Sequence, residues 1–259
     1  MQSRASYPTG LKEKDWNKIS NLFPREKALG RQKKYEDREI MNALFYISRS
    51  GCSWNMLPHD FSPSKTVYHI FNEWSKAGVF EKINDALRVN LRQLAGKEPV
   101  PGVGIIDSQS VKTIDIKGEK GYDGGKKIKG RKRHIFVDSF GFLIKVIVHA
   151  ADIQDRDGAK LLLESLNRFC SRLKLIWADG GYSGKLIAWV KETFGYDLEI
   201  IKKSDDAKGF KVLPKRWIVE RTFGWFNKFR RLSKDYESLP RNSQAMIYIA
   251  MISIMARRN

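Results

Sequence analysis

Three acidic residues, far apart in the chain, occur in settings that suit metal-dependent chemistry on phosphodiesters. Asp107 ends the apolar run of VGIID and Asp179 ends that of KLIWAD, so both are expected at strand ends, whereas Glu220 lies in RWIVERTFGWF, which has helical spacing. Carboxylates bind divalent ions, and two such ions activate an attacking oxygen and stabilise a leaving oxygen at phosphorus. Because open α/β sheets bind ligands at the carboxyl ends of their strands, we expect the three side chains to meet at one sheet edge.

Each of these acids also has an ordinary structural interpretation. Asp107 could cap a turn with Ser108, and Glu220 could pair with Arg216 or Arg221 on the same helix. Spacing alone therefore does not establish an active site, and the composition of the chain has to be weighed with it.

The composition is that of a strongly basic globular protein. Among 259 residues, 48 Lys and Arg face 29 Asp and Glu, which gives a net charge of +19. An excess of this size favours a polyanionic partner, and nucleic acid is the first candidate. The alternative is a basic protein that binds no polyanion.

Hydrophobic periodicity divides the chain at the Gly/Pro-rich connector 96–102. Before it, helical spacing predicts four helices, in residues 11–23, 37–51, 62–78 and 79–96. Beyond it, the pattern predicts a strand, a hairpin of two strands, and then helices alternating with strands. The predicted elements are strands 103–107, 133–138, 142–149, 174–179 and 196–201, and helices 155–173, 183–194, 214–232 and 242–257. This order predicts an α/β fold with a mixed sheet.

The segment 112–133 differs from its surroundings because it holds nine Lys or Arg and three acids, with interspersed glycines and few large apolar residues. We expect a solvated loop that contacts DNA phosphates beside the active site. The proposed contacts are Lys129, Arg131, Lys132 and Arg133.

The two cysteines, Cys52 and Cys170, form no disulfide or metal-binding pattern, which favours a reducing compartment. The N-terminus lacks the apolar stretch of a signal peptide, and the apolar run 245–256 is too short to span a bilayer. We therefore expect a cytoplasmic protein without a membrane partner.

Several long motifs resemble the DDE transposases of bacterial insertion sequences, above all the insertion-sequence-five group. They are IIDSQSVKT, GYDGGKKIKGRKRHIFVDSFGFLIKVIVHAADIQDRDGA, WADGGYSG and WIVERTFGWFNKFRRLSKDYE, with SGCSWNMLPHDFSPSKTVYHIFNEWSKAGVFEKI in the N-terminal part. The resemblance implies a ribonuclease-H-like catalytic core in 103–259, preceded by a small all-α DNA-binding domain in 1–96.

The resemblance also implies the chemistry. Asp107, Asp179 and Glu220 would hold Mg²⁺ or Mn²⁺, with two ions per site. The protein would bind double-stranded DNA at the element's terminal inverted repeats, cleave it, and transfer the 3′-hydroxyl ends to target DNA. Pairing two ends implies a homodimer or a larger assembly, associated with the nucleoid when DNA is bound.

One signature of the family is incomplete. Around the glutamate, relatives carry Tyr-(2)-Arg-(3)-Glu-(6)-Lys; Arg216 and Glu220 fit this pattern, but Leu213 and Asn227 occupy the Tyr and Lys positions. Arg216 either orients Glu220 or holds a phosphate. The missing positive charge could come from Lys228, Arg230, Arg231 or Lys234.

The predicted helix 64–76 is a candidate DNA-recognition helix, and the alternative is an ordinary member of a helical bundle. Its proposed DNA-facing residues are Lys65, Thr66, Tyr68, His69 and Asn72. For the whole chain, an active transposase competes with two alternatives: an inactive or domesticated DNA-binding protein of transposase origin, and a nuclease that only hydrolyses DNA.

Overall fold

The computed structural model describes residues 6–24, 33–115, 117–166, 171–201 and 216–258. Its first part is helical, as predicted. The helices are α1 (Glu13–Trp16), α2 (Asp37–Ser50), α3 (Ser64–Lys76) and α4 (Val79–Leu94), with short 3-10 turns at Ser20–Leu22 and Trp54–Met56. Gly51 ends α2 with φ 75°, the left-handed conformation that glycine adopts readily at helix ends.

The second part is built on one mixed sheet. Its strands are β1 (Val103–Lys112), β2 (Gly121–Asp123), β3 (Ile128–Val137), β4 (Leu143–Ala150), β5 (Leu175–Ala178) and β6 (Asp197–Ile200). The order β2-β3-β1-β5-β6 places β1 in the middle, and β4 also pairs with β3. The first strands pair antiparallel, whereas β5 and β6 run parallel to β1. The predicted mixed α/β architecture is confirmed.

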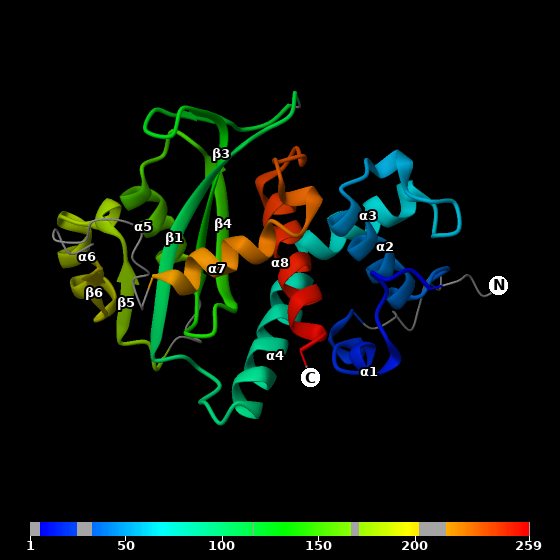
Figure 1. The fold of residues 1–259 in the computed structure, drawn as a ribbon, viewed down its shortest axis with the longest axis horizontal. Coiled ribbons are helices and arrows are strands. Elements are labelled where there is room, and N and C mark those ends of the chain that lie inside the picture. Colours follow the sequence, from blue (N-terminus) through cyan, green and yellow to red (C-terminus); the bar gives the residue numbers. More distant parts are fainter. Residues whose placement is uncertain (1–5, 25–32, 116, 167–170, 202–215, 259) are drawn as a thin grey trace.

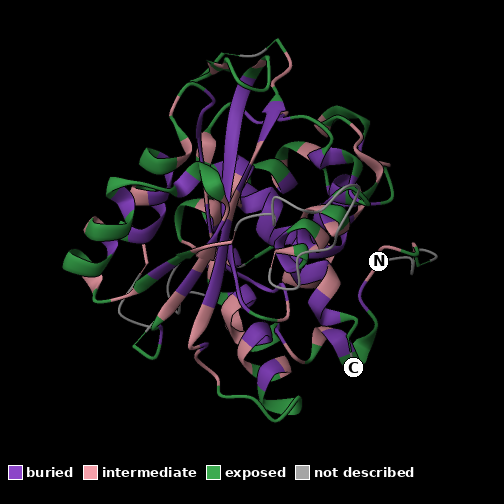
Figure 2. Ribbon diagram, turned by 60° about the vertical axis from the view of Figure 1, so that its left-hand side comes forward, coloured by how far each residue is buried: buried purple, intermediate pink, exposed green. Residues whose placement is uncertain are grey.

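Helices cover both faces of this sheet (Figure 1). On one face lie α5 (Asp155–Glu164) and α6 (Lys185–Phe194); on the other lie α7 (Trp217–Phe226), α8 (Pro240–Ala256) and the N-terminal helices. Alternate residues of β1 serve the two faces: Ile105 belongs to the larger apolar cluster and Ile106 to the smaller one. Figure 2 shows the long strands buried and the outer faces of the helices exposed.

The C-terminal helix α8 is buried around most of its circumference because it packs against α2, α3, α4 and β4. The larger apolar cluster therefore contains residues from both sides of the connector 96–102. Among the helices that the structure describes, none is both long enough and apolar enough to cross a membrane.

Two local expectations were wrong. The segment 112–133 is not one loop, because Lys112 still pairs with β3, Gly121–Asp123 form β2, and residues 128–133 belong to β3. Helix α7 ends at Phe226, and a separate 3-10 turn follows at Arg230–Leu232.

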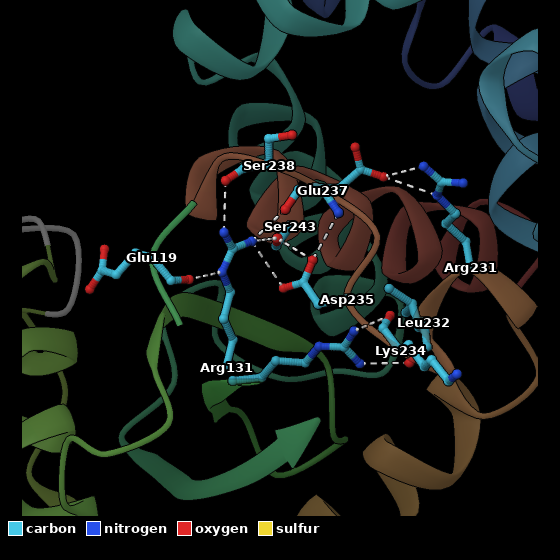
Figure 3. Close-up of polar contacts among 10 residues, drawn as sticks. Glu119, Arg131, Arg231, Leu232, Lys234, Asp235, Glu237, Ser238 and Ser243 are labelled. Carbon is cyan, nitrogen blue, oxygen red and sulfur yellow. Dashed lines mark hydrogen bonds and ion pairs between the residues drawn. The ribbon is translucent and has the colours of Figure 1, made fainter. Parts of the chain in front are cut away.

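Buried arginines of β3 hold the segment that follows α7 against the sheet (Figure 3). The Arg131 guanidinium donates hydrogen bonds to the carbonyls of Glu119, Glu237 and Ser238, and it lies 3.4 Å from the Asp235 carboxylate. The carbonyls of the same segment also accept from a second β3 arginine. Arg133 donates to the carbonyls of Leu232 and Lys234. These contacts fix the end of α7 relative to β3, and thus help to place α7 on the sheet.

We expect Arg131→Met to lower the free energy of unfolding by about 3–5 kcal/mol, because it leaves the buried Asp235 carboxylate and several carbonyls without their donor. Urea unfolding followed by circular dichroism measures this difference. The matched control is Lys129→Ala, two residues earlier on the same strand and exposed, which should change it by less than about 0.5 kcal/mol. Equal effects of the two substitutions would contradict the structural role of Arg131.

Candidate active site

The strand pairing brings Asp107 and Asp179 together at the end of β5. Strands β1 and β5 run parallel, with Ile105 opposite Trp177. Continuing this register by two residues sets Asp107 beside Asp179, which directly follows Ala178, the last residue of β5. The sequence prediction is right for Asp179. It is wrong for Asp107, which lies in mid-strand because antiparallel pairing with β3 extends β1 beyond it.

Burial dominates the electrostatics of Asp107. It raises the pKa of this carboxyl to about 6, and the negative charge of Asp179 acts in the same direction. The backbone N–H of Ser108, at 2.7 Å, and the positive charges of Arg216 and Lys126 oppose this rise. The proximity of two carboxylates therefore carries an electrostatic cost, which a cation at this position would offset.

Glu220 approaches the two aspartates from α7, which crosses β1 (Figure 1). Arg216 lies between Glu220 of α7 and Asp179, which follows β5. Its Nη2 atom is 3.8 Å from Asp179 Oδ2 and 3.4 Å from Glu220 Oε1. Asp179 also accepts a 2.9 Å hydrogen bond from the N–H of Gly181, which fixes its carboxylate. The predicted pairing of Arg216 with Glu220 is present, and the guanidinium lies within ion-pair distance of two acids.

These carboxylates are oxygen donors of the type that Mg²⁺ and Mn²⁺ prefer. In the part of the chain that the structure describes, no three His, Cys, Asp or Glu side chains converge closely enough to hold a metal ion. Arg216 supplies positive charge beside Asp179 and Glu220 instead. The donor set fits a divalent ion, and closing the site around one requires Glu220 and Arg216 to shift.

Two further charged residues lie beside the acids and were not placed there by sequence reasoning. Lys126 Nζ lies 3.5 Å from the carbonyl oxygen of Ser108. Asp155, the first residue of α5, accepts a 2.8 Å hydrogen bond from Ser108 Oγ and pairs with Lys132 at 3.0 Å. The turn sequence Asp-Gly-Gly at 123–125 is a hairpin signal that could have located Lys126.

A buried histidine pair supports the helix that carries Asp155. His134 Nδ1 and His149 Nε2 are 2.9 Å apart, and burial, together with the neighbouring His149, lowers the pKa of His134 to about 3, so the ring is neutral at physiological pH. Gly158 of α5 lies directly over the pair, since a Cβ there would come within 2.3 Å of the His134 ring. Glycine at this position permits the close approach of α5 to β3.

The residues predicted to contact DNA fall into two groups. Exposed on the surface are Lys65, Tyr68, Lys129, Lys228 and Arg230. Buried, with their charged groups bound to the protein's own carbonyls or carboxylates, are Arg131, Lys132, Arg133 and Arg231. The side chain of Asn72 bonds to the Tyr68 carbonyl and to Asn242. Leu213 lies outside the described residues.

The raised pKa of Asp107 predicts a pH-dependent effect of Asp107→Asn on stability in the presence of a chelator. A carboxyl whose pKa is higher in the folded than in the unfolded chain stabilises the fold at low pH, and this stabilisation is lost as the pH rises through about 6. Asparagine mimics the neutral acid. The free energy of unfolding of the variant should therefore exceed that of the wild type by up to about 3 kcal/mol at pH 8 and by little at pH 4.

Urea unfolding at both pH values measures this difference. The control is Asp197→Asn, which removes an acid whose side chain is 66% exposed and should change stability by less than about 0.5 kcal/mol at either pH. A pH-independent effect of Asp107→Asn would contradict the assigned environment.

Comparison with known proteins identifies the family of this chain. Residues 98–255 match the model of the family described as transposase DDE domain, and residues 11–84 match that of a putative transposase of the IS4/5 family. A putative transposase for insertion sequence element IS402 from Burkholderia cepacia is 27% identical over 115 residues, which cover 42% of this chain and 54% of that protein. The chain thus spans about half the length of this relative. The resemblance seen in the motifs is confirmed at the level of the family: the chain belongs to the transposase DDE domain family and is of the IS4/5 type.

Proposed function

We propose that this chain is an active transposase that binds the ends of an insertion sequence, cleaves the DNA and transfers the 3′-hydroxyl ends to target DNA. The observation that carries the proposal is the position of Asp107 beside Asp179 at the end of β5, with Glu220 on α7 linked to Asp179 through Arg216. A DDE-domain family and a net charge of +19 agree with DNA as the substrate.

In this proposal Asp107, Asp179 and Glu220 bind two Mg²⁺ or Mn²⁺ ions. When bound, these ions supply activation of the attacking oxygen and charge stabilisation at the leaving oxygen. The two aspartates come from paired strands, so their backbones are fixed, whereas the Glu220 side chain is 52% exposed and can reorient. The attacking groups are water and then a DNA hydroxyl, so no covalent protein–DNA intermediate forms.

A ribonuclease-H-like core is the finer fold assignment that we propose for 103–259. It is supported by the sheet, in which antiparallel β1, β3 and β4 are followed by β5 and β6, which run parallel to β1. Helix α5 lies between β4 and β5 in the chain, and α6 lies between β5 and β6. For 1–96 we propose DNA recognition through α3, whose Lys65 and Tyr68 are exposed. Pairing of two DNA ends would require at least a homodimer.

The proposed phosphate contacts are narrowed to the exposed basic residues Lys129, Lys228 and Arg230, together with Arg216 at the acids. The four buried basic residues are left out because their charges are used inside the protein.

The first test combines the protein, a duplex with the terminal DNA of the element that encodes it, a target plasmid and Mg²⁺ or Mn²⁺. We expect joined products, and a loss of about 100-fold or more in Asp107→Asn, Asp179→Asn and Glu220→Gln, because each removes a ligand that stabilises the transition state. Glu199→Gln, on the neighbouring strand β6, is the control and should retain joining.

The products separate the alternatives. Cleavage without joining supports a hydrolytic nuclease, and DNA binding without cleavage supports an inactive DNA-binding protein. Joining that survives all three substitutions would show that these acids do not form the active site.

The second test measures DNA affinity at several salt concentrations. If Lys129 contacts a phosphate, Lys129→Ala should weaken binding to a similar extent on different sequences and lower the slope of log K against log salt by about 1. Lys191→Ala, on α6 and paired with Asp197, serves as the control. Equal slopes for Lys129→Ala and the wild type would remove Lys129 from the interface.

A further inference from the structure

The family signature lacks its lysine here, since Asn227 occupies that position. The basic residues that follow Asn227 lie, like position 227 itself, beyond the last residue of α7. Glu220 lies in the first turn of α7, and the helix then leads away from it to Phe226, about 9 Å along the axis. Beyond that end, the Lys228 carbonyl accepts a hydrogen bond from Arg49 of α2, so the chain has reached the N-terminal helices.

The other three candidates lie far from the acids or bind another group of the protein. Arg230 packs against Gly51, just after α2. Arg231 is buried and makes a two-pronged contact with the Glu237 carboxylate. Lys234 precedes Asp235, whose N–H bonds to the Lys112 carbonyl; this is five residues beyond the catalytic aspartate of β1, about 17 Å along an extended strand.

Lys126, by contrast, lies in the turn between β2 and β3 and extends toward Asp107. Its exposed side chain extends to the carbonyl oxygen of Ser108, the residue after Asp107. It is close enough that its charge acts on the Asp107 carboxyl. An ammonium group that is open to solvent and close enough to act on the Asp107 carboxylate can bind a phosphate oxygen that arrives there.

The turn that carries Lys126 is fastened to the sheet. The Asp123 carboxylate accepts hydrogen bonds from Ser110 Oγ of β1 and from the Lys126 N–H, and it lies 3.8 Å from Lys132 Nζ. Lys127, the next residue, has φ 55°, a left-handed conformation that tightens the turn. The position of Lys126 is therefore set by the fold of the β2–β3 hairpin and not by chance contact of a loose loop.

We propose that the ammonium group of Lys126 binds a non-bridging oxygen of the DNA phosphate positioned at Asp107 and Asp179, so that a phosphate-binding charge comes from the β2–β3 turn in a chain whose signature lysine is absent. This inference rests on the proposed function, because it requires DNA at the acids. It assigns a substrate-binding role to the β2–β3 turn.

The test pairs the loss of one protein charge with the loss of one DNA charge. Binding is measured in EDTA with a series of duplexes carrying the element's terminal DNA, each with one phosphate replaced by a neutral methylphosphonate. At one position the wild type should lose about five- to tenfold in affinity. Lys126→Ala should bind the unmodified duplex that much more weakly and show no further loss at that position. Lys127→Ala, a change at the exposed neighbour, should behave as the wild type. Lys126→Arg should again lose affinity when that phosphate is replaced by a methylphosphonate.

Cleavage in Mn²⁺ is measured in parallel, which separates the two proposals. If Lys126→Ala keeps the same sensitivity as the wild type at every position, the inference is overturned even if the wild type cleaves. If Lys126→Ala removes the effect of one methylphosphonate but the wild type does not cleave, the role of Lys126 in DNA binding stands and the proposed transposase activity is contradicted. A wild type that binds no duplex overturns both.

Discussion

The pairing of the central strand β1 with two neighbours of opposite direction determines most of the candidate site. Parallel pairing with β5 sets Asp107 beside Asp179 where β5 stops. Antiparallel pairing with β3 carries β1 five residues further, to Lys112, and this extension is the surface on which the β2–β3 turn rests. The end of one neighbour and the continuation of the other thus create an open edge lined by charged side chains.

Charge compensation governs the arrangement at this edge. Two carboxylates lie side by side, and the burial of Asp107, together with the negative charge of Asp179, raises the pKa of Asp107 to about 6. Arg216 lies within ion-pair distance of Asp179 and Glu220, and the positive charge of Lys126 acts on Asp107. The residues that surround the acids therefore supply, in part, the positive charge that divalent ions would bring.

The basic residues are of two kinds that the sequence does not distinguish: some are exposed to solvent, and others are buried and bind the protein's own carbonyls. Arg131 and Arg133 look like neighbours of the exposed Lys129 in one basic run, yet they are buried and bind carbonyls of the segment after α7 (Figure 3). Alternation along a strand does not separate them, since consecutive residues of β3 are buried on both faces of the sheet. Which arginines meet solvent depends on the segment that covers the strand, and that segment is about 100 residues away in the chain.

The sequence by itself determined the helical first part, the mixed sheet, the family, and the three acids as candidates, because periodicity and local motifs reside in contiguous residues. It misjudged the end of β1 at Asp107, since an apolar run stops where burial on one face stops, whereas backbone pairing with β3 continues. Only the tertiary structure decided that Arg216 joins Asp179 to Glu220, that Asp155 turns to Ser108, and that Lys126 reaches the acids. These contacts join segments whose proximity is set by strand register and helix crossing, which local sequence does not encode.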